Sequence, residues 1–110
     1  VKGFKADKRE TMLGELYQWT REMAKEYCPI IGVCQASATA EGKKWLTMDD
    51  VAESKTTKAA EADFIIGVGK THDEGQEDVR YLHIIKNKLT GNHARITCRI
   101  RADIGRYEDF

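Results

Sequence analysis

The sequence has few of the residues that hold a small protein together through covalent or metal cross-links. Its three cysteines, Cys28, Cys34 and Cys98, are an odd number, and none stands at the C-x-x-C spacing of zinc or redox sites. The three histidines also lack metal-ligand spacing. We therefore expect no metal site and no disulfide framework, but buried thiols in a reducing, cytoplasmic compartment.

Long apolar runs and an excess of charge of one sign are also missing. The longest apolar stretch, residues 29–34, is far shorter than the roughly 20 residues of a bilayer-spanning helix, so we expect no membrane partner. The 18 basic and 18 acidic residues cancel, so net charge alone predicts no nucleic-acid partner. At 110 residues, the chain is expected to be one domain or a portion of one, spanning 1–110.

The first third of the sequence predicts a long helix followed by a strand. Apolar residues recur at helical spacing over residues 8–26, and residues 7–10 have the spacing of a capping box. Pro29 stops the helix, and residues 30–34 (Ile-Ile-Gly-Val-Cys) have no polar interruption. Such a run is typical of a strand buried on both faces of a parallel sheet. We therefore expect an α/β fold with a mixed, mostly parallel sheet.

The rest of the sequence predicts loops, short helices and a C-terminal hairpin. We expect an exposed functional loop at 35–44, a short helix at 48–53 capped by Thr47 with Asp50 in its third position, and a helical turn at 59–62. Strands are predicted at 63–68, 79–86 and 93–101, with a last edge strand at 106–108. The apolar run after Asp63 predicts a buried strand.

Residues 67–71 (Gly-Val-Gly-Lys-Thr) resemble the end of a phosphate loop. The complete motif has a glycine five positions before Gly69, where this sequence has Phe64. The motif also needs a helix directly after it, whereas residues 72–78 are acidic and turn-like. We therefore do not expect these residues to hold a nucleotide phosphate.

Charge is unevenly distributed although its sum is zero. Residues 80–106 carry seven Arg or Lys against one acid, and residues 71–78 carry four acids and no Arg or Lys. In the strand at 93–101, strand alternation places Arg95, Thr97, Arg99 and Arg101 on one face. This basic stripe is either a solvated sheet face or a track for phosphates.

Four stretches in order are similar to the RecA-like hexameric replicative helicases, over nearly the whole chain. They are residues 33–37 (Val-Cys-Gln-Ala-Ser), 50–54 with 61–66 (Asp-Val-Ala-Glu-Ser and Glu-Ala-Asp-Phe-Ile-Ile), 84–91 (Ile-Ile-Lys-Asn-Lys-Leu-Thr-Gly) and 105–109 (Gly-Arg-Tyr-Glu-Asp). The resemblance implies the C-terminal half of a RecA-like core, with a long N-terminal helix and a C-terminal hairpin. Its phosphate loop and metal-binding Asp strand would lie upstream of Val1. The lysine variants look phage-like, which favours a phage helicase or primase-helicase acting in the cytoplasm of a bacterial host.

The resemblance also implies roles for three residues in ATP hydrolysis. Gln35, at the end of a strand, would contact the γ-phosphate or the attacking water and move the loop that follows. Lys86 and Lys88 would reach the γ-phosphate held by the adjacent subunit. Helicases usually have Arg at the second of these positions, and Lys88 supplies a point charge without a bidentate fork. The Lys-Asn-Lys triplet also resembles the recombinase branch of the fold.

Five lysines are implied to contact nucleic acid or nucleotide. Lys43, Lys44, Lys55 and Lys58 would neutralise DNA phosphates without reading bases, as a sequence-independent motor requires. Lys70 would pack on the nucleotide base. The family's Arg in residues 50–54 is Ala52 here, so Lys55 or Lys58 would replace its contact. Trp45 is either a core anchor of the short helix or a base-stacking residue.

The intact protein would use ATP and Mg2+, none of it ligated by residues of this chain. It would bind single-stranded DNA, assemble with itself into a hexameric ring and work with a primase and a polymerase. The alternatives are a RecA-like recombinase or repair ATPase, a non-enzymatic nucleic-acid-binding module that uses the arginine stripe, and a structural protein that binds neither DNA nor ATP.

Overall fold

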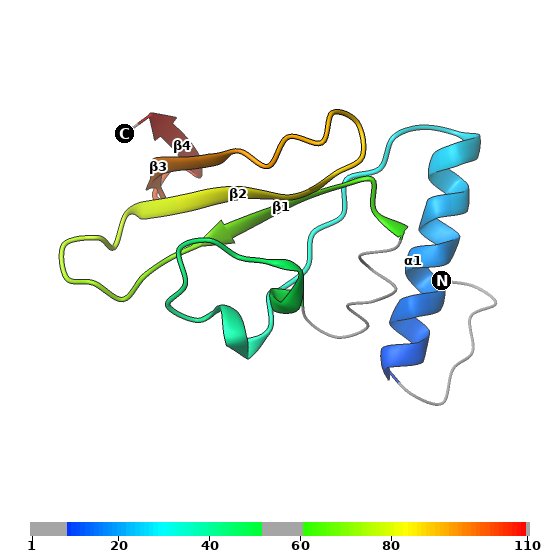
Figure 1. The fold of residues 1–110 in the computed structure, drawn as a ribbon, viewed down its shortest axis with the longest axis horizontal. Helices are drawn as coiled ribbons and strands as arrows, with labels where there is room; N and C mark the ends of the chain where they lie inside the picture. The colour runs from blue at the N-terminus through cyan, green and yellow to red at the C-terminus, as the bar shows by residue number, and fades with distance from the viewer. Residues whose placement is uncertain (1–8, 52–60, 110) are drawn as a thin grey trace.

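The computed structural model describes residues 9–51 and 61–109 as one long helix beside a four-stranded sheet (Figure 1). The elements are α1 (Arg9–Glu26), β1 (Phe64–Gly69), β2 (Val79–Asn87), β3 (Arg95–Arg101) and β4 (Arg106–Asp109), with two 3-10 turns, η1 (Ala38–Ala40) and η2 (Met48–Asp50). The expected long helix and C-terminal strands are confirmed to within two residues. The capping box at 7–10 and most of the helical turn at 59–62 lie outside the described residues.

All described strand pairs are antiparallel, in the order β1-β2-β3-β4. The expectation of a mostly parallel sheet is therefore wrong for the described part of the chain. The reason is the connections, because residues 70–78, 88–94 and 102–105 are too short for the crossover that a parallel pair needs. Each strand instead turns back beside its predecessor.

The apolar stretch at 30–34 does not form a strand. It runs extended from the end of α1 toward η1 without sheet pairing (Figure 1). The side chains of Ile31 and Val33 are 94% and 93% exposed. The prediction that this stretch is buried on both faces is wrong, because no strand of the described residues lies beside it. Its far end touches the helix, where Cys34 contacts Tyr17; burial and this neighbour raise the pKa of the tyrosine.

The buried core is small and centres on β2. Leu46, Val79, Tyr81 and Cys98 are its buried apolar side chains among the described residues. The run at 63–68 is not buried as expected, since β1 is an edge strand and its large side chains Phe64, Ile66 and Val68 are exposed. Two of the three thiols, Cys28 and Cys34, are exposed as well, against expectation. A single sheet with one neighbouring helix leaves much of its apolar surface uncovered.

The two glycines of β1 explain the partial phosphate-loop motif. Gly67 and Gly69 pair with His83 and Tyr81, so they share one face of the sheet. A Cβ on Gly69 would collide with the carbonyl oxygen of Lys44 and come within 2.6 Å of that of Lys43; one on Gly67 would come within 2.8 Å of Leu46. The glycines are required because the backbone of residues 43–46 lies directly on β1.

This packing predicts that Gly69→Ala lowers the free energy of unfolding by about 1–3 kcal/mol, because the added methyl group overlaps backbone that cannot move independently of the loop. Gly32→Ala is the matched control, since its Cβ would meet nothing within 4 Å. Urea unfolding followed by circular dichroism measures both. Equal stability of the two variants would show that the loop does not rest on β1.

Candidate functional site

The loop between the extended segment and β1 is organised around one buried carboxylate, that of Asp50, which is 2% exposed. It accepts hydrogen bonds from Thr39 Oγ1 (2.8 Å), Lys43 Nζ (2.7 Å) and the Thr47 backbone N–H (2.7 Å). The expected Thr47–Asp50 capping box is therefore present, on a 3-10 turn that ends at Asp50. A polar loop with little apolar content of its own is held together by this single group.

The contacts of Asp50 also set its ionisation. Burial raises the pKa of the carboxyl, but the hydrogen bonds from Lys43, Thr47 and Thr39 outweigh burial and lower the pKa to about 2. Asp50 is therefore ionised at neutral pH and holds the Lys43 ammonium as a partner. Removing the charge would leave several donors without their acceptor.

The two predicted DNA-binding lysines of this loop lie in different environments. Lys43 forms the ion pair with Asp50, and its backbone lies on β1. Lys44 is exposed and places its Nζ 5.4 Å from the centre of the Tyr81 ring, a cation–π contact. Lys55 and Lys58, and the Ala52 position, lie outside the described residues. Of this group, Lys44 is the described lysine that projects from the surface without a described carboxylate partner.

Trp45 anchors the loop on the sheet and belongs to a cluster of rings that the sequence did not reveal. Its ring meets Tyr81 edge-on at 5.3 Å and His83 at 6.4 Å between centroids. His83 Nδ1 donates a hydrogen bond to the Leu46 carbonyl oxygen (2.6 Å). The guanidinium of Arg95 lies 5.3 Å from the Trp45 ring centre. The alternation of Tyr81 and His83 along β2 was the available sequence signal, but it could not show that residue 45 packs on them.

The remaining arginines of the stripe face carboxylates. Arg99 lies 3.6 Å from Asp78, and Arg101 lies 3.6 Å from Asp103 and 3.8 Å from Glu108. These exposed, long pairs are weak, but they offset the positive charge locally. The stripe is therefore not uniformly basic.

Gln35 lies exposed at the end of the extended segment, where the organised loop begins. The next residue, Ala36, forms an isolated antiparallel bridge with Val51, and the Ser37 N–H donates to the Asp50 carbonyl oxygen (2.7 Å). The backbone after Gln35 is thus fastened to the far end of the loop. A displacement of Gln35 would be passed directly to Val51 and Asp50.

Lys86 is re-aimed by a bulge near the end of β2. Ile65 pairs with Lys86 but Ile66 pairs with Ile84, so Ile85 is an extra residue. Because paired residues share a face, Lys86 lies on the face of Ile65, Gly67 and His83. Burial and the neighbouring Lys88 lower the pKa of Lys86, against the opposing effect of Asp63.

Lys88 stands in the turn after β2, so the two lysines do not both project from a strand as expected. Its N–H donates to the Asp63 carbonyl oxygen (2.9 Å). The Asn87 side chain shapes the turn, because its Oδ1 accepts from the N–H groups of Leu89 and Thr90 (3.0 and 3.1 Å). This gives the middle residue of the Lys-Asn-Lys triplet a structural role that spacing alone did not indicate.

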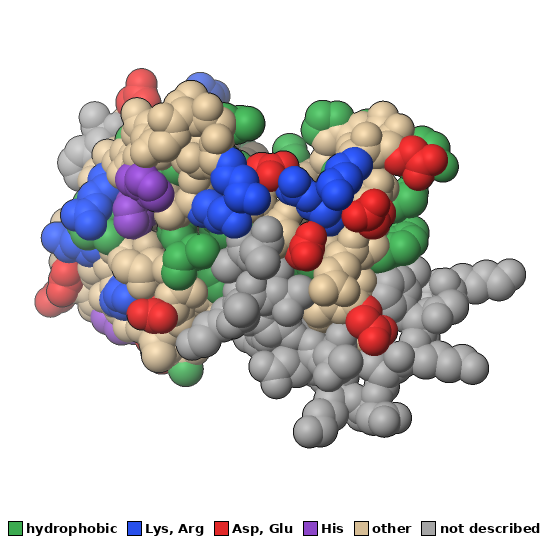
Figure 2. Space-filling view, turned by 45° about the vertical axis from the view of Figure 1, so that its right-hand side comes forward, with side chains coloured by type: hydrophobic (Ala, Val, Ile, Leu, Met, Phe, Trp, Pro, Cys, Tyr) green, Lys and Arg blue, Asp and Glu red, His purple; other side chains and the backbone are tan. Residues whose placement is uncertain are grey.

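An ion pair fastens α1 beside these lysines. Arg21 Nη1 donates to Asp63 Oδ1 (2.6 Å) and to the Glu61 carbonyl oxygen (3.0 Å). The hydrogen bond to Asp63 lowers the pKa of that carboxyl and raises the pKa of Arg21. Basic and acidic side chains meet at the junction of the helix and the sheet in Figure 2. The junction therefore gathers three cations, Arg21, Lys86 and Lys88, around Asp63.

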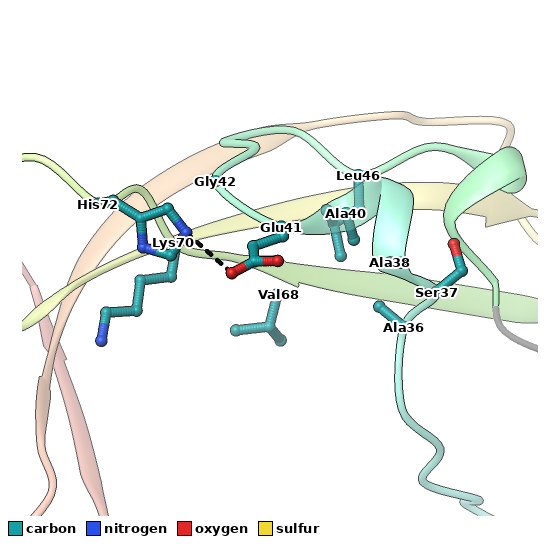
Figure 3. Close-up of a pocket in the computed structure, with 10 residues that line it drawn as sticks. All are labelled: Ala36, Ser37, Ala38, Ala40, Glu41, Gly42, Leu46, Val68, Lys70 and His72. Carbon is teal, nitrogen blue, oxygen red and sulfur yellow. Dashed lines mark ion pairs between the residues drawn. The ribbon is translucent and has the colours of Figure 1, made fainter.

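Lys70 lines an open depression of about 390 Å³ beside β1 (Figure 3). Small apolar side chains, among them Ala36, Ala40 and Val68, form much of its wall. His72 Nε2 lies 3.5 Å from Glu41 Oε1 across it, and the Lys70 amine points away from the alanines in Figure 3. Lys70 is thus accessible, and its contact with a nucleotide base stays a prediction.

The described residues contain no cluster of three or more His, Cys, Asp or Glu that could hold a metal ion. No helix within them is long and apolar enough to cross a membrane.

No protein-family model and no curated protein matches the sequence. Among solved structures, the chain is similar to the ATPase domain of a phage replicative helicase, with a TM-score of 0.80 at 16% identity. The match covers 98% of this chain and 40% of that chain, so this chain spans less than half of its length. The likeness confirms the expected RecA-like α/β fold. At this identity it extends to the fold alone, and the residue roles stay predictions.

The depressed pKa of Asp50 predicts a pH dependence of stability. Because its folded pKa is about 2, below the ordinary 3.8, its stabilisation is fully present above about pH 4 and is lost as the pH falls toward 2. The loss should be on the order of 1–2 kcal/mol. Asp50→Asn should remove this dependence and destabilise the chain at pH 7, whereas Asp49→Asn, at an exposed neighbour, should do neither. Urea unfolding between pH 2 and 7 measures the difference, and identical profiles for both variants would contradict it.

Proposed function

We propose that this chain is the C-terminal portion of an ATP-driven motor of the RecA-like hexameric helicase class. The intact protein would use ATP and Mg2+ to move along single-stranded DNA and unwind duplex at a replication fork. The observation that carries the proposal is the match of nearly the whole chain to part of an ATPase domain. Because the chain spans 40% of that domain's chain, hydrolysis is assigned to the larger protein and not to these residues alone.

The basic junction beside α1 supports a catalytic contribution to a neighbouring subunit. Lys88 is exposed in a turn that Asn87 and the Asp63 carbonyl oxygen hold in place. Lys86 is half-buried beside it and near the Arg21–Asp63 pair. Fixed cations stabilise the charge that develops on a transferring phosphoryl group, and supplying them in trans makes hydrolysis depend on ring assembly.

Gln35 supports the link between the nucleotide and the DNA. Its amide could orient water or contact a γ-phosphate, and its neighbour Ala36 is bridged to Val51. The residue that senses phosphate would then move the loop that carries Lys44. Lys55 and Lys58, together with Lys44, would hold the DNA backbone, and Lys70 would contact the base of the nucleotide.

A hexameric ring, a replication primase and a polymerase are the partners we propose for the intact protein, with a phage origin and action in the cytoplasm of a bacterial host. A RecA-like recombinase is the alternative within the same fold. A strand-separation assay on a forked duplex and a strand-exchange assay on homologous duplex distinguish the two activities.

The proposal predicts that Lys88→Gln in the intact protein lowers the DNA-stimulated ATPase rate by about 10²–10³-fold, because a transition-state cation is lost. If Lys88 acts in trans, mixing variant with wild-type subunits should reduce activity more steeply than the wild-type fraction. Lys25→Gln is the matched control, because Lys25 is exposed on α1 and pairs only with nearby Glu22 among the described residues.

An unchanged rate in Lys88→Gln would contradict the assigned role of the junction. The reading frame upstream of Val1 tests the wider proposal, and it should encode a complete phosphate loop and an apolar strand ending in Asp. A natural protein that starts near Val1 would overturn the motor and favour a nucleic-acid-binding module.

A further inference from the structure

The structure separates the basic side chains whose charge is offset from those whose charge is not. Lys43 pairs with Asp50, Arg99 with Asp78, and Arg101 with Asp103 and Glu108. Lys44 and Arg95 have no carboxylate partner among residues 9–51 and 61–109. One comes from the loop and the other from the arginine stripe, two groups that the sequence presents as unrelated.

These two cations lie on the same pair of rings. Lys44 is held over Tyr81 and Arg95 over Trp45, while Trp45 and Tyr81 meet edge-on. His83, which pairs with Arg95 across the strands, closes the group against Trp45. We call Lys44, Trp45, Tyr81 and Arg95 the cation–aromatic platform.

The platform is both accessible and preorganised. Lys44 and Arg95 are exposed and Trp45 is half-buried, whereas Tyr81 is 7% exposed and serves as the base of the group. The Leu46 carbonyl oxygen fixes His83, and the close approach of the loop to Gly69 fixes the backbone beneath Lys44. Little conformational freedom remains to be lost when a ligand binds.

We propose that the cation–aromatic platform binds single-stranded nucleic acid. A base stacks on the outer face of the Arg95 guanidinium, which the Trp45 ring supports from beneath, and the Lys44 ammonium contacts an adjacent phosphate. A planar guanidinium backed by an indole suits an unpaired base, whereas an acidic peptide offers no flat face to stack. Thr97, exposed on the same face between Arg95 and Arg99, extends the surface along β3.

This inference rests on the proposed function for its biological setting, since it names where the motor would hold its strand. Binding itself needs neither ATP nor Lys88. The two proposals can therefore fail separately. Loss of ATPase activity in Lys88→Gln would leave the platform untouched, and loss of oligonucleotide binding in platform variants would leave the trans-acting lysine untouched.

The test uses the 110-residue chain with Trp19→Phe, which leaves Trp45 as the remaining tryptophan. A labelled oligothymidine of about 12 nucleotides is titrated at several salt concentrations, with fluorescence anisotropy and Trp45 emission as readouts. We expect Trp45 emission to change on binding. Lys44→Gln with Arg95→Gln should weaken binding at least 10-fold at low salt and reduce the salt slope by about 1.4, or about 0.7 for each lost phosphate contact.

Two further variants separate stacking from charge. Arg95→Lys keeps the charge and loses the plane, so it should retain most of the salt slope while weakening binding several-fold. Arg101→Gln is the matched control on the same strand, because its charge is already offset by Asp103 and Glu108, and it should bind like the parent chain. Circular dichroism verifies that each variant is folded.

Three outcomes would overturn the proposal. They are equal losses in Arg101→Gln and the double variant, a Trp45 emission unchanged at saturation, and equal competition by polyglutamate of the same charge. The last would show a general polyanion surface with no preference for bases.

Discussion

The contact between the backbone of residues 43–46 and the glycine face of β1 determines most of the remaining structure. Only a residue without a Cβ admits two carbonyl oxygens at this distance, and Gly69 provides it at an edge strand. With the loop on β1, Leu46 enters the small core and Trp45 reaches Tyr81. The next residue on the N-terminal side, Lys44, is then directed over the same ring. A motif that resembles a phosphate loop is thus used for packing.

Asp50 supplies the complementary constraint inside the loop. Its carboxylate joins Thr39, Lys43 and Thr47, which come from both sides of the bend, and its carbonyl oxygen accepts from Ser37. Because this loop has few apolar side chains, polar contacts to one ionised group replace a hydrophobic core there. The segment that begins at Gln35 and the lysines at 43 and 44 therefore belong to one hydrogen-bonded unit, and a displacement at one end has to be accommodated at the other.

Local patterns predicted the elements well, while pairing and charge compensation depended on distant residues. Alternation over β3 and helical spacing over α1 are local, so their positions follow from sequence. Residues 30–34 have equally strong strand character, yet a strand needs a neighbour and none is described beside it. Asp50 was expected in a capping box, but its bond to Lys43 required the loop to close on itself. Nothing in the order of residues brings Trp45 to Arg95, because that contact joins segments 50 positions apart.

Strand β2 links the two candidate sites mechanically. Tyr81 and His83 support the cation–aromatic platform, and Lys86 follows three residues after His83, about 10 Å along a strand. The bulge at Ile85 turns Lys86 to the face that carries His83, so both sites open on the same side of the sheet. A regular strand would have placed Lys86 on the opposite face. The position of one extra residue therefore decides whether a strand held at the platform and a phosphate approached by Lys86 can act on the same surface.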